Sequence, residues 1–299
     1  MSRNGRRSIY RAEAADERPE IFREPVTAGE FGVVQKPLTR WERAYGNSAL
    51  RKVLLLVVFA LIWEIYARRL GNPLLVPTFT DTALAMRDGI LNGELQGRAW
   101  YSIKVLLGGY AAGLSLAAIL TMLAITSRLG TDILETFTSM FNPLPSIALL
   151  PLALIWFGLG KGALTFVIIH SVLWAVALNT HSGFLSVSNT LRMVGRNYGL
   201  TGLSYVARIL VPAAFPSILT GLKIGWAFAW RTLIAAEMVF GVASGQGGLG
   251  WFIYENKNLL EIANVFAGLF SVILIGLLVE NVVFRLIEQR TVRRWGMQS

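Results

Sequence analysis

Long apolar stretches recur along most of this chain, and they constrain its fold more than any other feature of the sequence. One of them, at residues 54–67, reads LLLVVFALIWEIYA. A helix needs about 20 mostly apolar residues to cross a bilayer. Charged residues make up only 15% of the 299-residue chain, whereas soluble domains usually carry about 25%. The sequence therefore predicts an all-α integral membrane protein.

The spacing of the apolar runs predicts six transmembrane helices. We expect them at about residues 52–69, 100–125, 132–157, 162–182, 217–241 and 263–287. The polar segment between the first two is expected to hold a short amphipathic helix at 81–91. Inside the third, Asn142, Pro143 and Pro145 predict either a break that leaves carbonyls facing a cavity or a plain kink. A plain kink is the more common outcome for prolines in such a helix.

The positions of the basic residues predict the orientation. Most of the 28 lysines and arginines lie in the N-terminal segment, in the second–third and fourth–fifth connections, and after the sixth apolar run. Basic residues accumulate on the cytoplasmic side of membrane proteins, so both termini are expected in the cytoplasm. The net charge of +10 is then a sign of topology, and no nucleic-acid partner is expected.

The same pattern divides the chain into three parts. Residues 1–48 are polar and basic and hold no apolar core of an export signal, so they are predicted to form a disordered cytoplasmic tail. Residues 49–290 form the six-helix membrane domain, in which a long cytoplasmic loop covers about 186–212. Residues 291–299 form a short cytoplasmic tail.

Several classes of chemistry lack their residues in this sequence. The chain has no cysteine and only two histidines, so thiolate catalysis and a metal site are not expected. The string GLGKG at 158–162 has neither the spacing nor the Ser or Thr of a phosphate-binding loop. We therefore expect no catalytic residue, and no ATP or other cofactor bound by this chain itself.

The long cytoplasmic loop contains a spacing that suits a helix projecting from the membrane and returning. Gly199 can supply a sharp turn, because glycine tolerates positive φ. Pro212 is expected to end the returning segment before the fifth span. Arg192 and Arg196 lie one helical turn apart, and they could meet acceptor groups on a partner or act only as cytoplasmic charges.

This loop resembles the EAA loop of ABC importer permeases, whose pattern is E-A-A-x3-G-x9-I-x-L-P. Gly199, Ile209 and Pro212 match the pattern in register, and Val211 replaces its leucine. The E-A-A triplet is absent, since Met-Val-Gly stands at 193–195. By the resemblance, Arg192, Arg196, Gly199, Ile209 and Pro212 would couple this chain to an ATPase.

Further blocks extend the resemblance over about residues 50–287. They include NPLPSIALLPLALIWFGLG in the third span and GLKIGWAFAWRTLIAAEMVFG in the fifth. Together they are similar to the permeases for nitrate, aliphatic sulfonates and taurine. The resemblance implies the type I ABC importer permease fold, a homodimer in the bacterial inner membrane, two ATPase subunits that hold ATP and Mg²⁺, and a periplasmic substrate-binding protein.

Ionisable and aromatic residues in the fifth span are the candidate pathway residues. Arg231 and Glu237 lie at membrane depth, where charges usually face a bundle interior or a water-filled pathway. Arg231 is expected to attract an anion, or alternatively to pair with Glu237 or helix-end carbonyls. Trp226 and Trp230 share one face beside it and either line the passage or pack. His170 in the fourth span is expected to bond across helices.

Other functions remain open from the sequence. The cargo could be a small anion such as nitrate, a sulfonate or taurine, or else an aromatic carboxylate or a pyrimidine-type solute. An ion-coupled secondary transporter is a further alternative. Such proteins often carry internal repeats and several buried carboxylates, whereas Glu237 is the one convincing deep carboxylate in this sequence and no repeat is evident.

Overall fold

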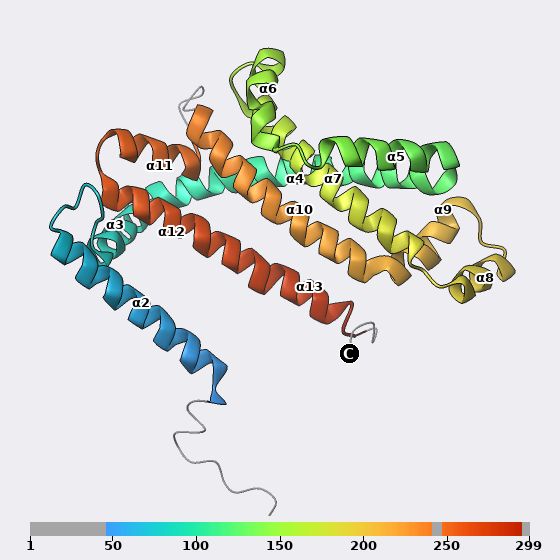
Figure 1. Ribbon diagram of the computed structural model, residues 1–299, viewed down its shortest axis with the longest axis horizontal. Coiled ribbons are helices and arrows are strands. Elements are labelled where there is room, and N and C mark those ends of the chain that lie inside the picture. The colour runs from blue at the N-terminus through green and yellow to red at the C-terminus, as the bar shows by residue number, and fades with distance from the viewer. Residues whose placement is uncertain (1–45, 241–246, 295–299) are drawn as a thin grey trace, which may run out of the picture. The chain divides into compact units, whose positions relative to one another are not determined.

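The computed structural model describes residues 46–240 and 247–294, and within these ranges every regular element is a helix (Figure 1). The chain divides into two compact units, Met1–Leu56 and Val57–Ser299, whose boundary falls inside the first long helix. The predicted tail 1–48 lies almost entirely outside the described residues. The prediction of an all-α chain is confirmed for the part that the structure describes.

The helices follow one another with short connections. In chain order they are α2 (Ser48–Leu70), α3 (Phe79–Leu91), α4 (Glu94–Thr126), α5 (Arg128–Phe141), η1 (Ser146–Leu149), α6 (Leu150–Phe157), α7 (Lys161–Leu185), α8 (Asn189–Asn197), α9 (Gly202–Tyr205), η2 (Val206–Leu210), α10 (Val211–Phe240), α11 (Leu249–Asn258), α12 (Ile262–Leu278), η3 (Val279–Phe284) and α13 (Arg285–Arg290). The amphipathic helix expected at 81–91 is present as α3.

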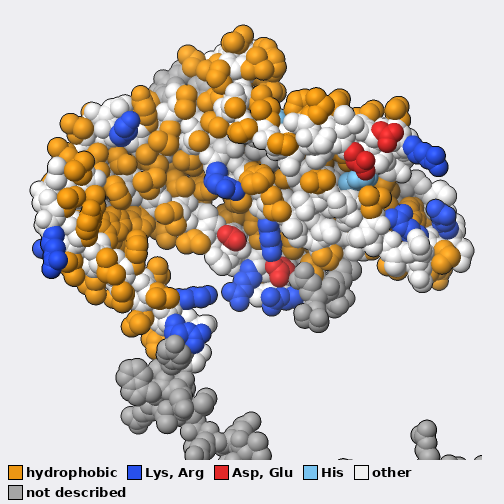
Figure 2. Space-filling view, viewed as in Figure 1, with side chains coloured by type: hydrophobic (Ala, Val, Ile, Leu, Met, Phe, Trp, Pro, Cys, Tyr) orange, Lys and Arg blue, Asp and Glu red, His pale blue; other side chains and the backbone are white. Residues whose placement is uncertain are grey.

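Four helices in the described ranges are long and apolar enough to cross a membrane. They are Glu94–Thr126, Lys161–Leu185, Gly202–Val239 and Ile262–Arg290. The broken pair α5 and η1–α6 makes a fifth if it is one span. Helix α2 is also long, at 23 residues. It is not among these helices, because charged side chains lie near both of its ends. Figure 2 shows hydrophobic side chains over much of one face, as expected of a chain that contacts lipid.

The third predicted span is broken rather than merely kinked. Helices α5 and η1–α6 meet at 88°, so the expectation of a plain kink at Asn142, Pro143 and Pro145 is wrong. Neither proline has an N–H to donate, and two of them within three residues stop the helical hydrogen-bond ladder. The chain continues through a turn in which Leu144 N donates to Phe141 O at 3.1 Å.

Helix α7 packs closely and in parallel against α4. A β-carbon on Gly109 would lie 2.7 Å from Cγ2 of Ile168, and one on Gly113 would lie 2.8 Å from Cβ of Val172. From the first contact to the second, the residue number rises by four on both helices, so the two helices run in the same direction. Small residues at such positions let helix backbones approach, and the resulting van der Waals packing favours helix association in a membrane.

Helix α10 also packs against α7, and it runs in the opposite direction. A β-carbon on Gly221 would lie 2.8 Å from Cβ of Asn179, and one on Gly225 would lie 3.0 Å from Cγ2 of Val176. Since α8 follows the end of α7 and α11 follows the end of α10, these two short helices lie at opposite ends of the bundle.

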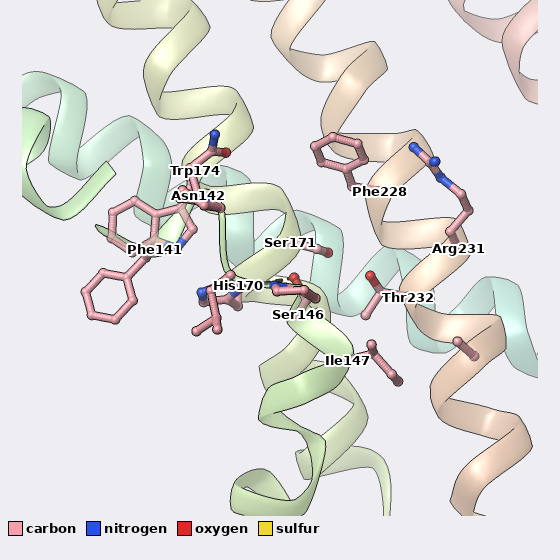
Figure 3. Close-up of a pocket in the computed structure, with 14 residues that line it drawn as sticks. Phe141, Asn142, Ser146, Ile147, His170, Ser171, Trp174, Phe228, Arg231 and Thr232 are labelled. Carbon is pink, nitrogen blue, oxygen red and sulfur yellow. Dashed lines mark hydrogen bonds between the residues drawn. The ribbon is translucent and has the colours of Figure 1, made fainter. Parts of the chain in front are cut away.

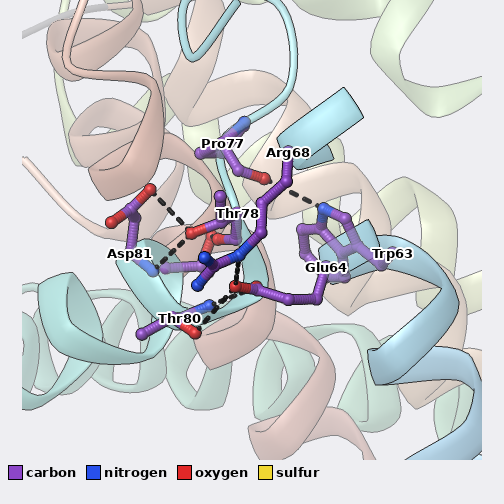
Figure 4. A network of polar contacts seen from close by, with 8 residues as sticks. Trp63, Glu64, Arg68, Pro77, Thr78, Thr80 and Asp81 are labelled. Atoms are coloured by element: carbon purple, nitrogen blue, oxygen red, sulfur yellow. Dashed lines mark hydrogen bonds and ion pairs between the residues drawn. The ribbon is translucent and has the colours of Figure 1, made fainter. Parts of the chain in front are cut away.

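A polar cluster joins the end of α2 to the start of α3 (Figure 4). The Glu64 carboxylate accepts hydrogen bonds from Thr80 N and Thr80 Oγ1, both at 3.1 Å, and pairs with Arg68 at 2.6 Å. Thr78 caps α3, since its hydroxyl accepts from Asp81 N at 3.0 Å. These bonds satisfy amides at the start of α3 and fix the turn between the two helices.

Trp63 fastens α2 to α12 beside this cluster. Its indole N–H donates to Pro77 O at 3.0 Å, and its ring lies 5.4 Å from Phe266 and 5.6 Å from Phe270. Phe79 contacts the same group, 5.8 Å from Trp63. One aromatic cluster therefore connects the second half of α2, the start of α3 and α12.

Trp63→Ala is expected to lower the free energy of unfolding by about 3 kcal/mol, because it removes a large aromatic side chain together with its hydrogen bond. The measurement is chemical unfolding of the purified protein in detergent. Phe59→Ala is the control, since Phe59 is exposed and touches the cluster only at its edge. Equal effects of the two substitutions would contradict an anchoring role for Trp63.

Candidate functional site

A cavity of about 380 Å³ lies where the break of the third predicted span faces α7 and α10 (Figure 3). The break contributes residues 141–147, and α7 contributes His170, Ser171 and Trp174. Helix α10 contributes Phe228, Arg231, Thr232 and Ala235. Arg231 is the charged residue among the described residues that line it, and none of them is a carboxylate.

The break gives the cavity its polar wall. Non-helical backbone at membrane depth is tolerated where it is buried in protein or lines a cavity that can hold water. Ser146, which begins η1, places its hydroxyl 3.0 Å from Nδ1 of His170. The prediction that His170 bonds across helices is therefore confirmed. Ser146 and His170 together hold the end of the break against the middle of α7.

Arg231 faces this cavity from α10. Its Nε donates to Ala227 O one turn earlier, at 3.1 Å, and its guanidinium lies 5.1 Å from the ring of Phe228. Both contacts hold the side chain along its own helix. Its side chain is exposed and forms no ion pair within the described part of the chain, so its remaining donors are available to a ligand.

Trp226 and Trp230 share a face of α10, as expected, but it is not the face of Arg231. The Trp230 side chain is buried and donates to Val272 O of α12 at 3.2 Å. Trp226 lies 5.4 Å from the ring of Tyr110 on α4. Neither tryptophan belongs to the cavity lining. A helical repeat places residues 226 and 230 together, whereas residue 231 is turned by about 100°.

Glu237 also lies away from the cavity. Its side chain is 3% exposed and accepts hydrogen bonds from Ser102 Oγ on α4 and Gly250 N on α11. The alternative in which Arg231 pairs with Glu237 is thus wrong, because the carboxylate is committed to a different face of α10. Glu237 does not line the Arg231 cavity in this structure.

Helix α8 ends in a sharp turn at Gly199. This glycine has φ +69°, Gly199 N donates to Arg196 O at 2.9 Å, and Leu200 N donates to Gly195 O at 3.0 Å. These are the two bonds of a Schellman motif, which requires a left-handed residue after the helix. The turn expected from the sequence at Gly199 is present.

The start of α8 is held to the end of α7 by Arg192. Its NH2 donates to Phe184 O at 2.6 Å, and its Nε donates to Val187 O at 3.0 Å. Phe184 O lies at the C-terminus of α7, where a cation is favourable, and Val187 belongs to the connection that follows. Arg196, one turn later, is exposed and forms no ion pair with any described residue. The two arginines therefore have different surroundings.

Close packing fixes α8 against the following helix. A β-carbon on Gly195 would lie 2.8 Å from Cε2 of Tyr205 and 3.0 Å from Cγ1 of Ile209. Ile209 thus contributes to the seat of α8. The outer side of this region carries exposed apolar side chains, since Met193 is 56% and Tyr198 81% exposed.

The prediction that Pro212 ends the returning segment is wrong. One helix runs from Gly202 to Val239, with Pro212 inside it. The segment η2 just before the proline is a π-helix, and Val211 N donates to Val206 O, five residues back. This wider turn accommodates a proline that can neither donate a hydrogen bond nor fit an ordinary α-turn.

The chain is similar to known transport permeases over most of its length. Residues 105–294 match the family described as "Binding-protein-dependent transport system inner membrane component". A putative ABC transporter permease of Methanocaldococcus jannaschii is 31% identical over 234 residues, covering 77% of this chain and 86% of the relative. The putative aliphatic sulfonates transport permease SsuC of Bacillus subtilis is 27% identical over 287 residues (95% and 98%). The nitrate import permease NrtB of Synechocystis is 29% identical over 246 residues (80% and 88%).

Gly195→Val is expected to displace α8, because the added side chain meets Tyr205 and Ile209 and overpacking of this kind costs about 1–3 kcal/mol. Hydrogen–deuterium exchange of the peptide covering 189–198 should accelerate. Gly108→Val is the matched control, since a β-carbon at Gly108 meets nothing within 4 Å. Unchanged exchange in Gly195→Val would show that the contact does not hold α8.

Proposed function

The chain belongs to the binding-protein-dependent transport system inner membrane components, and on that premise we propose that it forms the translocation pathway of an ATP-driven importer for a small anion. It is a transporter subunit rather than an enzyme, as its permease relatives are. The cargo class we propose is nitrate, a sulfonate, taurine or a similar organic anion.

The observation that carries this proposal is the position of Arg231. A lone guanidinium in a cavity without carboxylates attracts anions, and its planar fork of donors matches two oxygens of a nitrate, sulfonate or carboxylate group. A charge at membrane depth is costly and is usually kept for a solute pathway. Thr232 and Ser146 add hydroxyl groups to the same lining, which suits an oxygen-bearing solute.

We further propose six spans with both termini in the cytoplasm. Helix α2 would be the first span and the broken pair α5 and η1–α6 the third. The contacts of Trp63 and Glu64 with α3 and α12 support a first span that packs on the bundle. The basic residues of the sequence favour the end with α8 as the cytoplasmic side, so that α3 and α11 face outward.

The proposed partners follow from these two ends. Helix α8 would dock on an ABC ATPase through Met193, Tyr198 and Arg196, while Arg192, Gly199, Ile209 and Pro212 keep it in position. Two ATPase subunits would hold ATP and Mg²⁺, and two copies of this chain would pair around one pathway. A periplasmic substrate-binding protein would deliver the cargo to the outward end.

An aromatic carboxylate is the second candidate cargo. Phe141 and Trp174 stack at 5.4 Å between ring centres, and both line the cavity with Phe228. An aromatic wall near a guanidinium suits an anion with a planar apolar group. A pyrimidine-type solute and an ion-coupled secondary transporter have less support, because the described residues that line this cavity include Arg231 and no carboxylate.

The deciding experiment is transport by the full complex in proteoliposomes, assembled with its ATPase and binding protein. The binding protein would be loaded in turn with nitrate, taurine, an alkanesulfonate and an aromatic carboxylate. Stimulated ATP hydrolysis and uptake with one of them would identify the cargo. Uptake that needs an ion gradient but no ATP would replace this proposal with the secondary transporter.

Arg231→Gln is expected to lower the rate of uptake roughly 10- to 100-fold, the cost of losing a charged hydrogen-bonding partner. Assembly with the ATPase should not change. Arg87→Gln on α3 is the matched control, since Arg87 is exposed and pairs with its neighbour Asp88 at 2.8 Å. Undiminished uptake in Arg231→Gln would remove Arg231 from the pathway.

Met193→Glu is expected to reduce co-purification of the ATPase, because it places a charge in the apolar surface of α8 that we propose is buried on docking. The amount of ATPase retained per permease is the measurement. Leu91→Glu is the control, since Leu91 is also highly exposed but lies on α3. Full retention with Met193→Glu would place the docking surface elsewhere.

A further inference from the structure

Glu237 is a buried carboxylate that the proposed anion pathway does not use. Its oxygens accept from Ser102 Oγ at 2.9 and 2.8 Å and from Gly250 N at 2.9 Å. Ser102 Oγ in turn accepts from Leu249 N at 2.9 Å. Ser102 is on α4, Glu237 on α10, and the two amides open α11. We call these four groups the α11 latch.

The carboxylate has no cationic partner to explain its burial. None of the ion pairs in the described part of the chain includes Glu237, and Ser102 is fully buried. Taking an unpaired charge out of water is costly unless hydrogen bonds replace its hydration. All the bonds that do so here either come from α11 or run through a serine that α11 also contacts.

The fit between α11 and the carboxylate leaves no room for a side chain. A β-carbon on Gly248 would collide with Ser102 Oγ and with Oε1 of Glu237, and one on Gly250 would collide with Ile234 O. The glycines thus bring the backbone itself against the carboxylate. The first amides of a helix lack partners within it, and Glu237 and Ser102 supply them from other helices.

A second link joins α11 to α4 at the edge of the latch. Arg98 NH2 lies 2.8 Å from Oε2 of Glu255, and Arg98 NH1 donates to Gly247 O at 3.4 Å. This pair is partly exposed, so it adds less than the buried bonds. Both links tie α11 to the start of α4, at the end of the bundle opposite α8.

We propose that Glu237 is a positioning residue that latches α11 closed against α4 and α10, and that α11 leaves the latch when the permease opens outward. This inference rests on the importer function proposed above. In the closed state the backbone of α11 donates hydrogen bonds to the carboxylate, and in the open state water donates them instead. Two states that both satisfy a buried charge can lie close in free energy, so docking or ATP can shift the balance between them.

A thiol introduced by Leu249→Cys reports on the latch directly. The chain has no cysteine of its own, and the Leu249 side chain is fully buried. The substitution changes only the side chain, so the backbone N–H at 249 can still donate to Ser102 Oγ. In the purified permease alone, a maleimide should label it slowly. Adding Glu237→Ala should raise that labelling rate roughly tenfold. An unchanged rate would overturn the role of Glu237 as a latch.

Two controls separate a local latch from general loosening. A thiol at Ile168→Cys, fully buried between α4 and α7, should remain unlabelled with and without Glu237→Ala. Ser102→Ala should also speed labelling of the Leu249→Cys thiol, whereas Ser271→Ala should not. Ser271 is likewise buried, but it bonds only Ala267 O in its own helix. Labelling at both thiols would reduce Glu237 to a general packing role.

The full complex tests the functional half of the inference. Glu237→Ala should raise ATP hydrolysis without binding protein several-fold and reduce the further stimulation by loaded binding protein. In Glu237→Gln, ATP hydrolysis should again depend in part on loaded binding protein. Equal loss of basal and stimulated hydrolysis would contradict the latch. If the unaltered complex shows no stimulation at all, the importer proposal fails, while the labelling of the isolated permease still decides whether Glu237 holds α11.

Discussion

The structure depends on one constraint, which is that every backbone amide and carbonyl at membrane depth must find a partner within the protein. Long helices meet it along most of their length. Where the helical ladder is interrupted, the structure supplies another partner or a cavity. The break at 142–145 opens onto the Arg231 cavity, and η2 widens its turn ahead of Pro212. The first amides of α11 are satisfied by Glu237 and Ser102.

The second determinant is the close approach of helices at small residues. Gly109 and Gly113 seat α7 on α4, and Gly221 and Gly225 seat α10 on α7. Once these contacts are made, the rotation of α10 about its axis is fixed. Arg231 then faces the cavity, while the face with Trp230 and Glu237 is turned toward other helices. The polar residues of one apolar helix are thereby separated into two sites.

Much of the helix content was predictable from the sequence. The length of the apolar runs predicted the long helices, and an amphipathic pattern predicted α3. The turn at Gly199 followed from the need for a left-handed residue. The orientation of each helix was not predictable, because lipid tails are as apolar as a protein core and both faces of a membrane helix look alike. For that reason Trp226 and Trp230 could be placed on one face, but the neighbours of that face could not be named.

The errors at prolines and charges have a similar origin. A proline shows that an α-turn is disturbed but not how the disturbance is resolved, so Pro212 was expected to end a helix that continues through a π-turn. At Pro143 and Pro145 the same chemistry produces a full break. The sequence allows Arg192 to contact a partner, whereas in the structure it bonds Phe184 O at the end of α7 and Val187 O in the connection that follows. Side-chain reach across a connection is a three-dimensional property that spacing along the chain does not encode.

The contacts of α8 indicate how its movement would reach the cavity. Arg192 ties α8 to the end of α7, and Gly195 seats it against Tyr205 and Ile209, which belong to the same continuous helix as Arg231. A force on α8 therefore acts on α7 and α10, two of the segments that line the cavity. Because α10 also carries Glu237 beyond Arg231, one continuous helix connects the residues that contact α8 with the cavity and the α11 latch. If the proposed docking on α8 moves this helix, a tilt of α10 would carry the movement to both sites without a separate relay of side chains.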